Sequence, residues 1–286
     1  MVELASRRPF VTRVPFRHDG LSRGALVVLG LLILLGTLGT ALPLGSPTEL
    51  VGPRLDGPAG GWILGTDALG RSMLPRVVEG TRTTLVLAGS AAMIAALLGT
   101  AIGIVAGYFG SVLDELVVRA ADVLFSFPAI IFAILVAAVL GPGDAGVIAS
   151  IVLITLPLMV LVVRSATRAV VSRDFVTAAR VGGASTPRIL IMHILPNVAD
   201  AAIVQATFAV SVGMLVESGL SFLGLGVQPP GASLGSLVQE GSVYITIAPW
   251  LVLGPGVVLG LAILAVNLLG EGLAAAVDPR GRSVIR

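Results

Sequence analysis

Side chains that could do chemistry are scarce in this 286-residue chain. There are two histidines, His18 and His193, and no cysteine, which excludes disulfides, thiolate metal sites and a cysteine nucleophile. The sequence has no H-E-x-x-H, G-x-S-x-G or G-x-x-x-x-G-K-[ST] motif, so a zinc protease, a serine hydrolase and a phosphate-binding loop have no signature here. We interpret His193 as a capping or packing residue, and expect energy to come from a partner protein or an ion gradient.

The segment 172–196, SRDFVTAARVGGASTPRILIMHILP, is instead charged and helix-patterned within a mostly apolar chain. Ala178 and Ala179 would give a short helix a smooth face that fits a groove on another protein. Gly183 supplies the backbone freedom needed where that helix ends. Thr186 and Pro187 have the pattern of an N-cap followed by a first helical proline, so a second helix should begin there. The segment therefore predicts a helix-turn-helix elbow on the membrane face.

The elbow also provides the candidate binding residues. Arg180 and Arg188 would be available to acidic residues of a partner or to anionic lipid headgroups. The other interpretation is a solvated loop whose arginines only set the topology. The residues that we expect to contact a partner are Thr177, Ala178, Ala179, Arg180, Gly183 and Arg188.

Composition places the elbow in a membrane protein. Apolar residues make up 56% of the chain, charged residues only 12%, and the mean hydropathy is +1.02. Soluble chains carry about 25% charged residues, so this chain must lie in lipid. The pI of 9.9 comes with a formal net charge of only +2 and no arginine run interleaved with aromatics, so we expect no nucleic-acid partner.

Six charge-free stretches are candidates to cross the roughly 30 Å hydrocarbon core, which needs about 20 helical residues. The fifth, 201–216, is too short unless Asp200 or Glu217 lies at an interface. We therefore expect an all-α integral membrane protein with six transmembrane helices and a cytoplasmic helical loop at 172–196. The first span is interpreted as uncleaved. The expected division is an N-terminal tail 1–23, a transmembrane domain 24–275 with spans at about 24–44, 82–107, 119–140, 145–166, 198–220 and 248–272, and a tail 276–286.

Arginine asymmetry orients these spans. Arginines concentrate in 1–23, in 164–188 and in the C-terminal tail, whereas the 223–247 loop has none. Positive residues favour the cytoplasmic side, so both termini and the elbow should face the cytoplasm. The outer arginines would be Arg54, Arg71, Arg76 and Arg82.

Small and charged residues near the membrane allow two interpretations, structural packing or a role in gating. The glycines that share one span at near-helical spacing are Gly89, Gly99, Gly103 and Gly107. Glu79 and Arg82 could pair across one helical turn. A similar charged cluster contains Asp114, Glu115, Arg119 and Asp122. Glu217 and Glu271 are expected to be interfacial.

Several motifs resemble those of ABC import permeases, in the C-type group of the dipeptide/oligopeptide/nickel branch. Their coupling loop reads E-A-A, three residues, Gly, nine residues, then I-x-L-P. Here the spacing is kept, with Thr177 in place of Glu and His193 in place of Ile. The other matching stretches are LGTDALGR at 64–71, GYFGS at 107–111 with Asp114, Arg119 and Asp122, ESGLSFLGLGVQPP at 217–230, and Asp278-Pro279-Arg280.

This resemblance implies a type I ABC importer-like fold and a permease subunit, not an enzyme, that translocates di- or oligopeptides. The implied partners are a homologous second permease, two ATP-binding subunits that hold ATP and Mg, and an extracytoplasmic substrate-binding protein. No cofactor is expected in this chain itself, and the expected location is the bacterial cytoplasmic membrane. The alternatives are a nickel or other small-solute permease of the same branch and, from another class, an ion-gradient-driven secondary transporter.

Overall fold

The computed structural model describes residues 20–39, 43–58 and 61–277, and the regular elements within these ranges are helices. The predictions for His18, for most of both tails and for Asp278-Pro279-Arg280 fall outside the described residues. The main helices are α1 Gly20–Leu38, α2 Met73–Phe109, α3 Ser111–Phe125, α4 Ala129–Leu140, α5 Asp144–Val171, α8 Leu195–Phe222 and α10 Trp250–Val277. The short elements are α6 Asp174–Val181, α7 Thr186–Arg188, a π-helical turn Ile189–Ile194 and α9 Leu234–Ser242.

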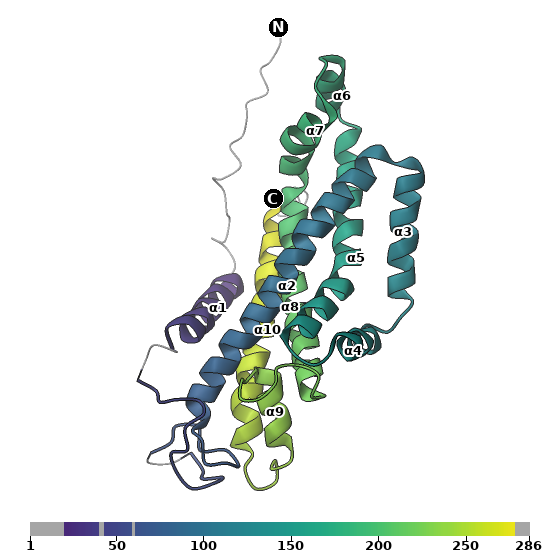
Figure 1. The fold of residues 1–286 in the computed structure, drawn as a ribbon. Helices are drawn as coiled ribbons and strands as arrows, with labels where there is room; N and C mark the ends of the chain where they lie inside the picture. Colours follow the sequence, from purple (N-terminus) through teal and green to yellow (C-terminus); the bar gives the residue numbers. More distant parts are fainter. Residues whose placement is uncertain (1–19, 40–42, 59–60, 278–286) are drawn as a thin grey trace.

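Helices α2, α5, α8 and α10 run along the long axis of the molecule (Figure 1). The short helices α6 and α7 lie at one end, which we call the elbow end. The helix α9 and the loop before α2 lie at the opposite end, which we call the α9 end. Because all four long helices reach from one end toward the other, the bundle connects the two ends directly.

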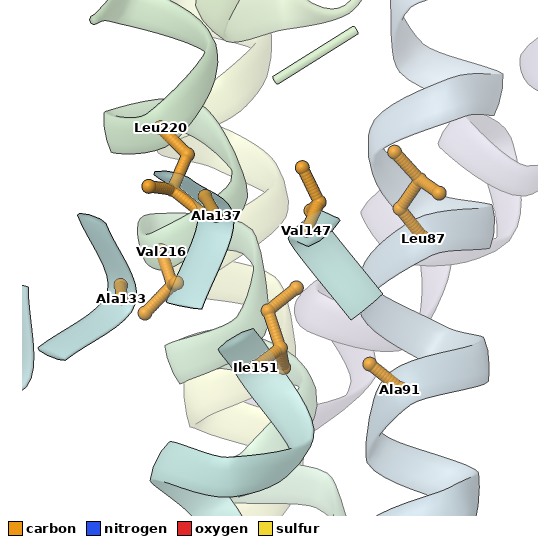
Figure 2. Packing of buried hydrophobic residues seen from close by; sticks show 8 residues of the cluster. All are labelled: Leu87, Ala91, Ala133, Ala137, Val147, Ile151, Val216 and Leu220. Atoms are coloured by element: carbon orange, nitrogen blue, oxygen red, sulfur yellow. The ribbon is translucent and has the colours of Figure 1, made fainter. Parts of the chain in front are cut away.

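The central core forms where α2, α4, α5 and α8 meet (Figure 2). Small side chains such as Ala91 and Ala133 lie beside larger ones such as Ile151 and Leu220, and all four are buried. Helices suit this environment because each satisfies its own backbone polar groups, which lipid cannot do.

Helices α2 and α5 approach each other unusually closely. A Cβ atom placed on Gly99, Gly103 or Gly107 would lie 2.4 to 2.9 Å from a side-chain or backbone atom of α5. Gly89 differs, because a Cβ atom there would meet nothing within 4 Å. The glycine face predicted from the sequence therefore comprises three of the four residues.

Five helices are long and apolar enough to cross a membrane: α1, α2, α5, the continuous helical stretch Thr186–Phe222, and α10. The expected span 119–140 is instead a pair, α3 and α4, bent by 92° at the break between them. Pro128 is the N-cap of α4, and a residue that precedes a proline is disfavoured in a helix, which accounts for the break at Phe127. The six expected spans are obtained if this pair counts as one.

Other boundaries also move. Helix α1 ends at Leu38, short of the expected limit at residue 44. Helix α2 begins at Met73, nine residues before the expected span, and its 37 residues make it roughly 55 Å long. The expected loop 172–196 and the expected span 198–220 are not separate, because one helical stretch runs from Thr186 to Phe222.

Candidate functional site

The first arm of the elbow is α6, which ends at a glycine as predicted. Gly183 has φ +78°, a backbone conformation that glycine adopts without steric cost. The N–H of Gly183 donates to the carbonyl of Arg180 at 3.1 Å, and that of Ala184 to the carbonyl of Ala179 at 3.0 Å. This pair of bonds is the Schellman pattern, which satisfies the last carbonyls of a helix and turns the chain out of it.

The second arm begins one residue earlier than predicted. Ser185, and not Thr186, is the N-cap, and its side chain makes no capping hydrogen bond. The arm then continues through the π-helical turn, where the N–H of Leu195 donates to the carbonyl of Leu190. Asn197 Nδ2 donates to the carbonyl of His193 at 2.7 Å. The second arm is thus continuous with α8.

Both arms are anchored to the bundle by apolar side chains. Val176 of α6 and Ile194 of the second arm are fully buried. They pack in a cluster with side chains of α2 and α5, namely Ile104, Met159, Val163 and Val170, together with Ile189 and Val198. Because the buried residues come from both arms, the elbow is held in one orientation on the bundle.

The opposite side of α6 points away from the bundle. Phe175 and Val181 are 39% and 84% exposed, and Ala178 between them is exposed as well. These residues follow the spacing of one helical face and form an exposed apolar stripe. Ala179 is half-buried against the chain's own core, so the smooth face predicted from the two alanines is divided between the core and the surface.

Of the two predicted arginines, one has an internal partner. The guanidinium of Arg180 lies 5.5 Å from the centre of the Tyr108 ring at the end of α2, a cation–π contact. Arg188 is exposed, and no side chain in the described part of the chain pairs with it. The sequence does not predict Tyr108 as a site residue, because it lies 72 residues before Arg180 and no local pattern indicates a contact between the two.

The charged cluster after α2 divides between two partners. Asp114 accepts hydrogen bonds from Nε and Nη2 of Arg164 and from Nη1 of Arg168, which fixes the start of α3 to the end of α5. Arg119 pairs instead with Glu115 on the surface of α3. The predicted structural pairing therefore occurs, but the tertiary part of it uses arginines of the 164–188 group.

A second charged cluster lies at the α9 end. Asp67 accepts hydrogen bonds from Arg71 Nε at 2.6 Å and from Arg76 Nη1 at 2.8 Å. Glu240 accepts two hydrogen bonds from Arg76, at 2.8 and 3.1 Å. Burial raises the pKa of Asp67, but the backbone N–H groups of Arg71 and Leu69 and the Arg71 guanidinium outweigh it, so the pKa lies below its ordinary value. The cluster borders an open cavity of about 410 Å³ between the loop before α2 and α9.

Two carboxyl groups differ from expectation. Among the described residues, Glu79 and Arg82 form no ion pair, and Oε2 of Glu79 is buried without a hydrogen-bond partner. Glu217 is fully buried inside the bundle, and its carboxylate accepts hydrogen bonds from Thr84, Ser218 and Ser221. The sequence could not show this, because Thr84 is 133 residues away.

These features describe a candidate site for contact with another protein. A short helix with an exposed apolar stripe is held by a buried core on the ends of α2, α5 and α8, which extend through the bundle. Among the described residues, no group of three His, Asp or Glu side chains could hold a metal ion. The arrangement is suited to receive a force from another protein and to convert it into movement of long helices.

Comparison with known proteins agrees with this description. Residues 99–283 match the family described as "Binding-protein-dependent transport system inner membrane component". The chain is 38% identical over 79% of its length to the "Di/tripeptide transport system permease protein DppC" of Pseudomonas aeruginosa, covering 75% of that protein. It is 34% identical over its whole length to the "Oligopeptide transport system permease protein OppC" of Mycobacterium bovis, covering 99% of it. It is 35% identical over 80% of its length to the "Glutathione transport system permease protein GsiD" of Pectobacterium atrosepticum, covering 76% of it.

Fold, elbow and relatives together define a multi-pass membrane permease with the type I importer fold, and not an enzyme. The chain belongs to the family of binding-protein-dependent transport system inner membrane components.

Proposed function

We propose that this chain is one permease subunit of an ATP-driven importer that carries di- or oligopeptides across the bacterial cytoplasmic membrane. The observation that carries the proposal is the exposed apolar stripe of Phe175, Ala178 and Val181 on a firmly anchored helix. A large apolar side chain such as Val181 at 84% exposure, at the end of a membrane bundle, is suited to a groove on a partner protein.

The partner that fits this stripe is an ATP-binding subunit. The chain has no phosphate-binding loop of its own, so ATP and Mg would be bound, and ATP hydrolysed, by two such subunits. When these subunits close on ATP, they would push the elbow, and α2, α5 and α8 would switch between inward-facing and outward-facing states. A second, homologous permease and an extracytoplasmic binding protein would complete the complex.

Orientation follows from the arginines. Arg164 and Arg168 belong to the last turns of α5, Arg173 precedes α6, and Arg180 and Arg188 lie in the two arms of the elbow. Positive residues favour the cytoplasmic side of a membrane, so the elbow and both termini would face the cytoplasm and α9 the outside. A topology reporter fused after Arg173 should give a cytoplasmic signal, and one in 228–241 an external signal. Opposite signals at the two positions would contradict the orientation.

Peptide is the cargo best supported by the relatives. Two of them are named for peptides of different length and one for glutathione, itself a tripeptide. The nickel permease remains the second candidate within the same branch. Family membership speaks against a carrier driven by an ion gradient.

Reconstitution would test the cargo and the energy source together. The chain is combined in proteoliposomes with a second permease, ATP-binding subunits and a binding protein from the same organism. We expect uptake of a labelled dipeptide or tripeptide that requires ATP and is not driven by a proton or sodium gradient. Uptake of nickel but not of peptide would support the second candidate, and gradient-driven uptake without ATP would overturn the proposal.

A further inference from the structure

The short helix α9 is attached to α2 at both of its ends. Near its C-terminal end, Glu240 receives the two hydrogen bonds of Arg76, which is 2% exposed. At its N-terminal end, the backbone N–H of Leu234 donates to the hydroxyl oxygen of Thr84 at 3.2 Å. The two attachment points are more than one helical turn apart on both α2 and α9. Together they prevent α9 from rotating away from α2.

Glu217 of α8 determines how the N-terminal attachment is made. The hydroxyl of Thr84 has one proton, and it donates that proton to Oε2 of Glu217 at 2.9 Å. A lone pair of the same oxygen then faces the N–H of Leu234. Ser221 and Ser218 donate to the carboxylate of Glu217 at 2.7 and 3.2 Å, and these hydroxyl donors hold it in place.

The buried position of Glu217 costs free energy, so the residue is expected to have a specific role. The residue is fully buried in a membrane bundle, where an ionisable side chain is expensive and is usually functional. Its hydrogen-bond partners are three hydroxyl groups, and no arginine in the described part of the chain pairs with it. The carboxylate therefore stabilises one arrangement of α2, α8 and α9, and it does so through Thr84.

The backbones also meet at this point. A Cβ atom on Gly80 of α2 would lie 3.0 Å from the carbonyl carbon of Ser233 and 3.1 Å from the nitrogen of Leu234. A Cβ atom on Gly235 of α9 would lie 2.5 Å from the Cα atom of Ser218. The N-terminal end of α9 thus lies directly against α2 and α8 with no side chain between them.

We propose that Glu217 is a positioning residue that holds α9 to α2 through Thr84, so that α2 and α9 move as one body during transport. At the elbow end of α2, Tyr108 lies under Arg180 and the three glycines pack against α5. A displacement of the elbow therefore reaches α9 through one continuous helix of 37 residues. The inference rests on the proposed function in one respect, that a partner displaces the elbow.

The absence of cysteine from the chain allows a direct test. The Gly80→Cys/Ser233→Cys variant places thiols on two adjacent residues, since a Cβ atom on residue 80 lies 3.0 Å from the carbonyl carbon of Ser233. We expect the disulfide to form on oxidation in the complete reconstituted complex, and ATP-dependent uptake of a labelled dipeptide to stay within twofold of that of the reduced protein. Each single-cysteine variant is the control, and Ser233→Cys also reports the loss of the N-cap hydroxyl.

The decisive step adds Glu217→Ala to the double-cysteine protein. With the thiols reduced, α9 is loosened and uptake should fall at least fivefold. Oxidation should restore it to within twofold, because the disulfide replaces the attachment that Glu217 provided. Thr84→Val, which removes the hydroxyl at nearly constant volume, should show the same loss and the same rescue, and it serves if Glu217→Ala does not reach the membrane.

Each other outcome overturns the proposal. A pair that stays reduced shows that α9 does not lie against α2. Uptake that falls on oxidation with Glu217 intact shows that α9 must separate from α2, as a hinged lid would. Loss without rescue shows that Glu217 acts on substrate, a proton or an ion instead. The complex with the unmutated chain is assayed first, because its failure to take up any peptide contradicts the proposed function while disulfide formation still reports on α9.

Discussion

Gly103 of α2 lies directly against Val160 of α5, so closely that a Cβ atom on the glycine would be 2.8 Å from the valine carbonyl oxygen. Gly99 and Gly107, one turn away on either side, meet α5 in the same way. Because this contact leads directly to the core beneath the elbow, the close approach of α2 and α5 fixes the platform on which the elbow sits.

Gly103→Leu should therefore destabilise the protein. The side chain would force two helix backbones apart, and overpacking of this type costs about 1–3 kcal/mol. Gly89→Leu on the same helix is the matched control, since a Cβ atom there meets nothing within 4 Å and a change within about 0.5 kcal/mol is expected. Thermal unfolding in detergent compares the two variants. Equal midpoints would contradict the assignment of Gly103 to a tight interface.

Gly183→Leu should uncouple transport from ATP hydrolysis more than it lowers abundance in the membrane. Its φ of +78° is strained for any residue with a side chain, at a cost on the order of 1–3 kcal/mol. The strain is local to the turn, because a Cβ placed there would meet no other described residue within 4 Å, apart from its two chain neighbours.

The control is Gly182→Ala, one residue earlier, where φ is −72° and the backbone needs no left-handed conformation, although the new Cβ atom lies 3.2 Å from the carbonyl oxygen of Ala178. We expect this variant to couple normally, while Gly183→Leu reaches normal abundance with sharply reduced uptake and no stimulation of ATPase by substrate. Normal uptake by Gly183→Leu would show that the turn tolerates other backbone conformations and that the elbow is not a rigid lever.

The lowered pKa of Asp67 predicts how the stability of the protein depends on pH. Its pKa is lowered in the folded protein from the ordinary value of 3.8, so the ionised form is favoured by folding. Such a group stabilises the protein above its unfolded pKa, and the contribution is lost as the pH falls through the folded pKa.

Asp67→Asn should accordingly cost about 1.5–3 kcal/mol at neutral pH, since hydrogen bonds to a charged group are lost. The difference between the two proteins should be constant from about pH 5 to pH 8 and should shrink below about pH 4. Unfolding of both proteins across this range is the measurement. A difference that already shrinks near pH 6 would mean that the carboxyl is not held ionised by Arg71 and Arg76.

Sequence patterns of short range predict much of this structure. Gly183, a single residue in a polar segment, is enough to predict where α6 ends, and long apolar stretches predict most spans. The 92° break between α3 and α4 is less visible, because the prolines at 157 and 255 lie inside helices while Pro128 starts one. The effect of a proline depends on whether neighbouring helices can satisfy the freed carbonyl.

Contacts of long range are the part that sequence could not supply. Glu217 has the same local setting as an interfacial carboxylate, and only its approach to Thr84 from another helix shows that it is buried. Arg76 and Glu240 are 164 residues apart. Arg180 contacts Tyr108 because the fold brings α6 next to the end of α2. Ala179 is likewise half-buried because Val176 packs into the core and turns that side of α6 toward it.

The central claim is that the stripe on α6 docks on an ATP-binding subunit, and site-directed crosslinking tests it most directly. Cysteines are introduced singly at Thr177, Ala178 and Arg180, which are exposed, and at Val176, which is buried, as the inward-facing control. We predict that the three exposed positions crosslink to the ATP-binding subunit, with a yield that changes between the ATP-bound and nucleotide-free complex, and that Val176→Cys does not. Crosslinks to lipid or to a second copy alone, or a yield that is the same at Val176 and Ala178, would contradict the account.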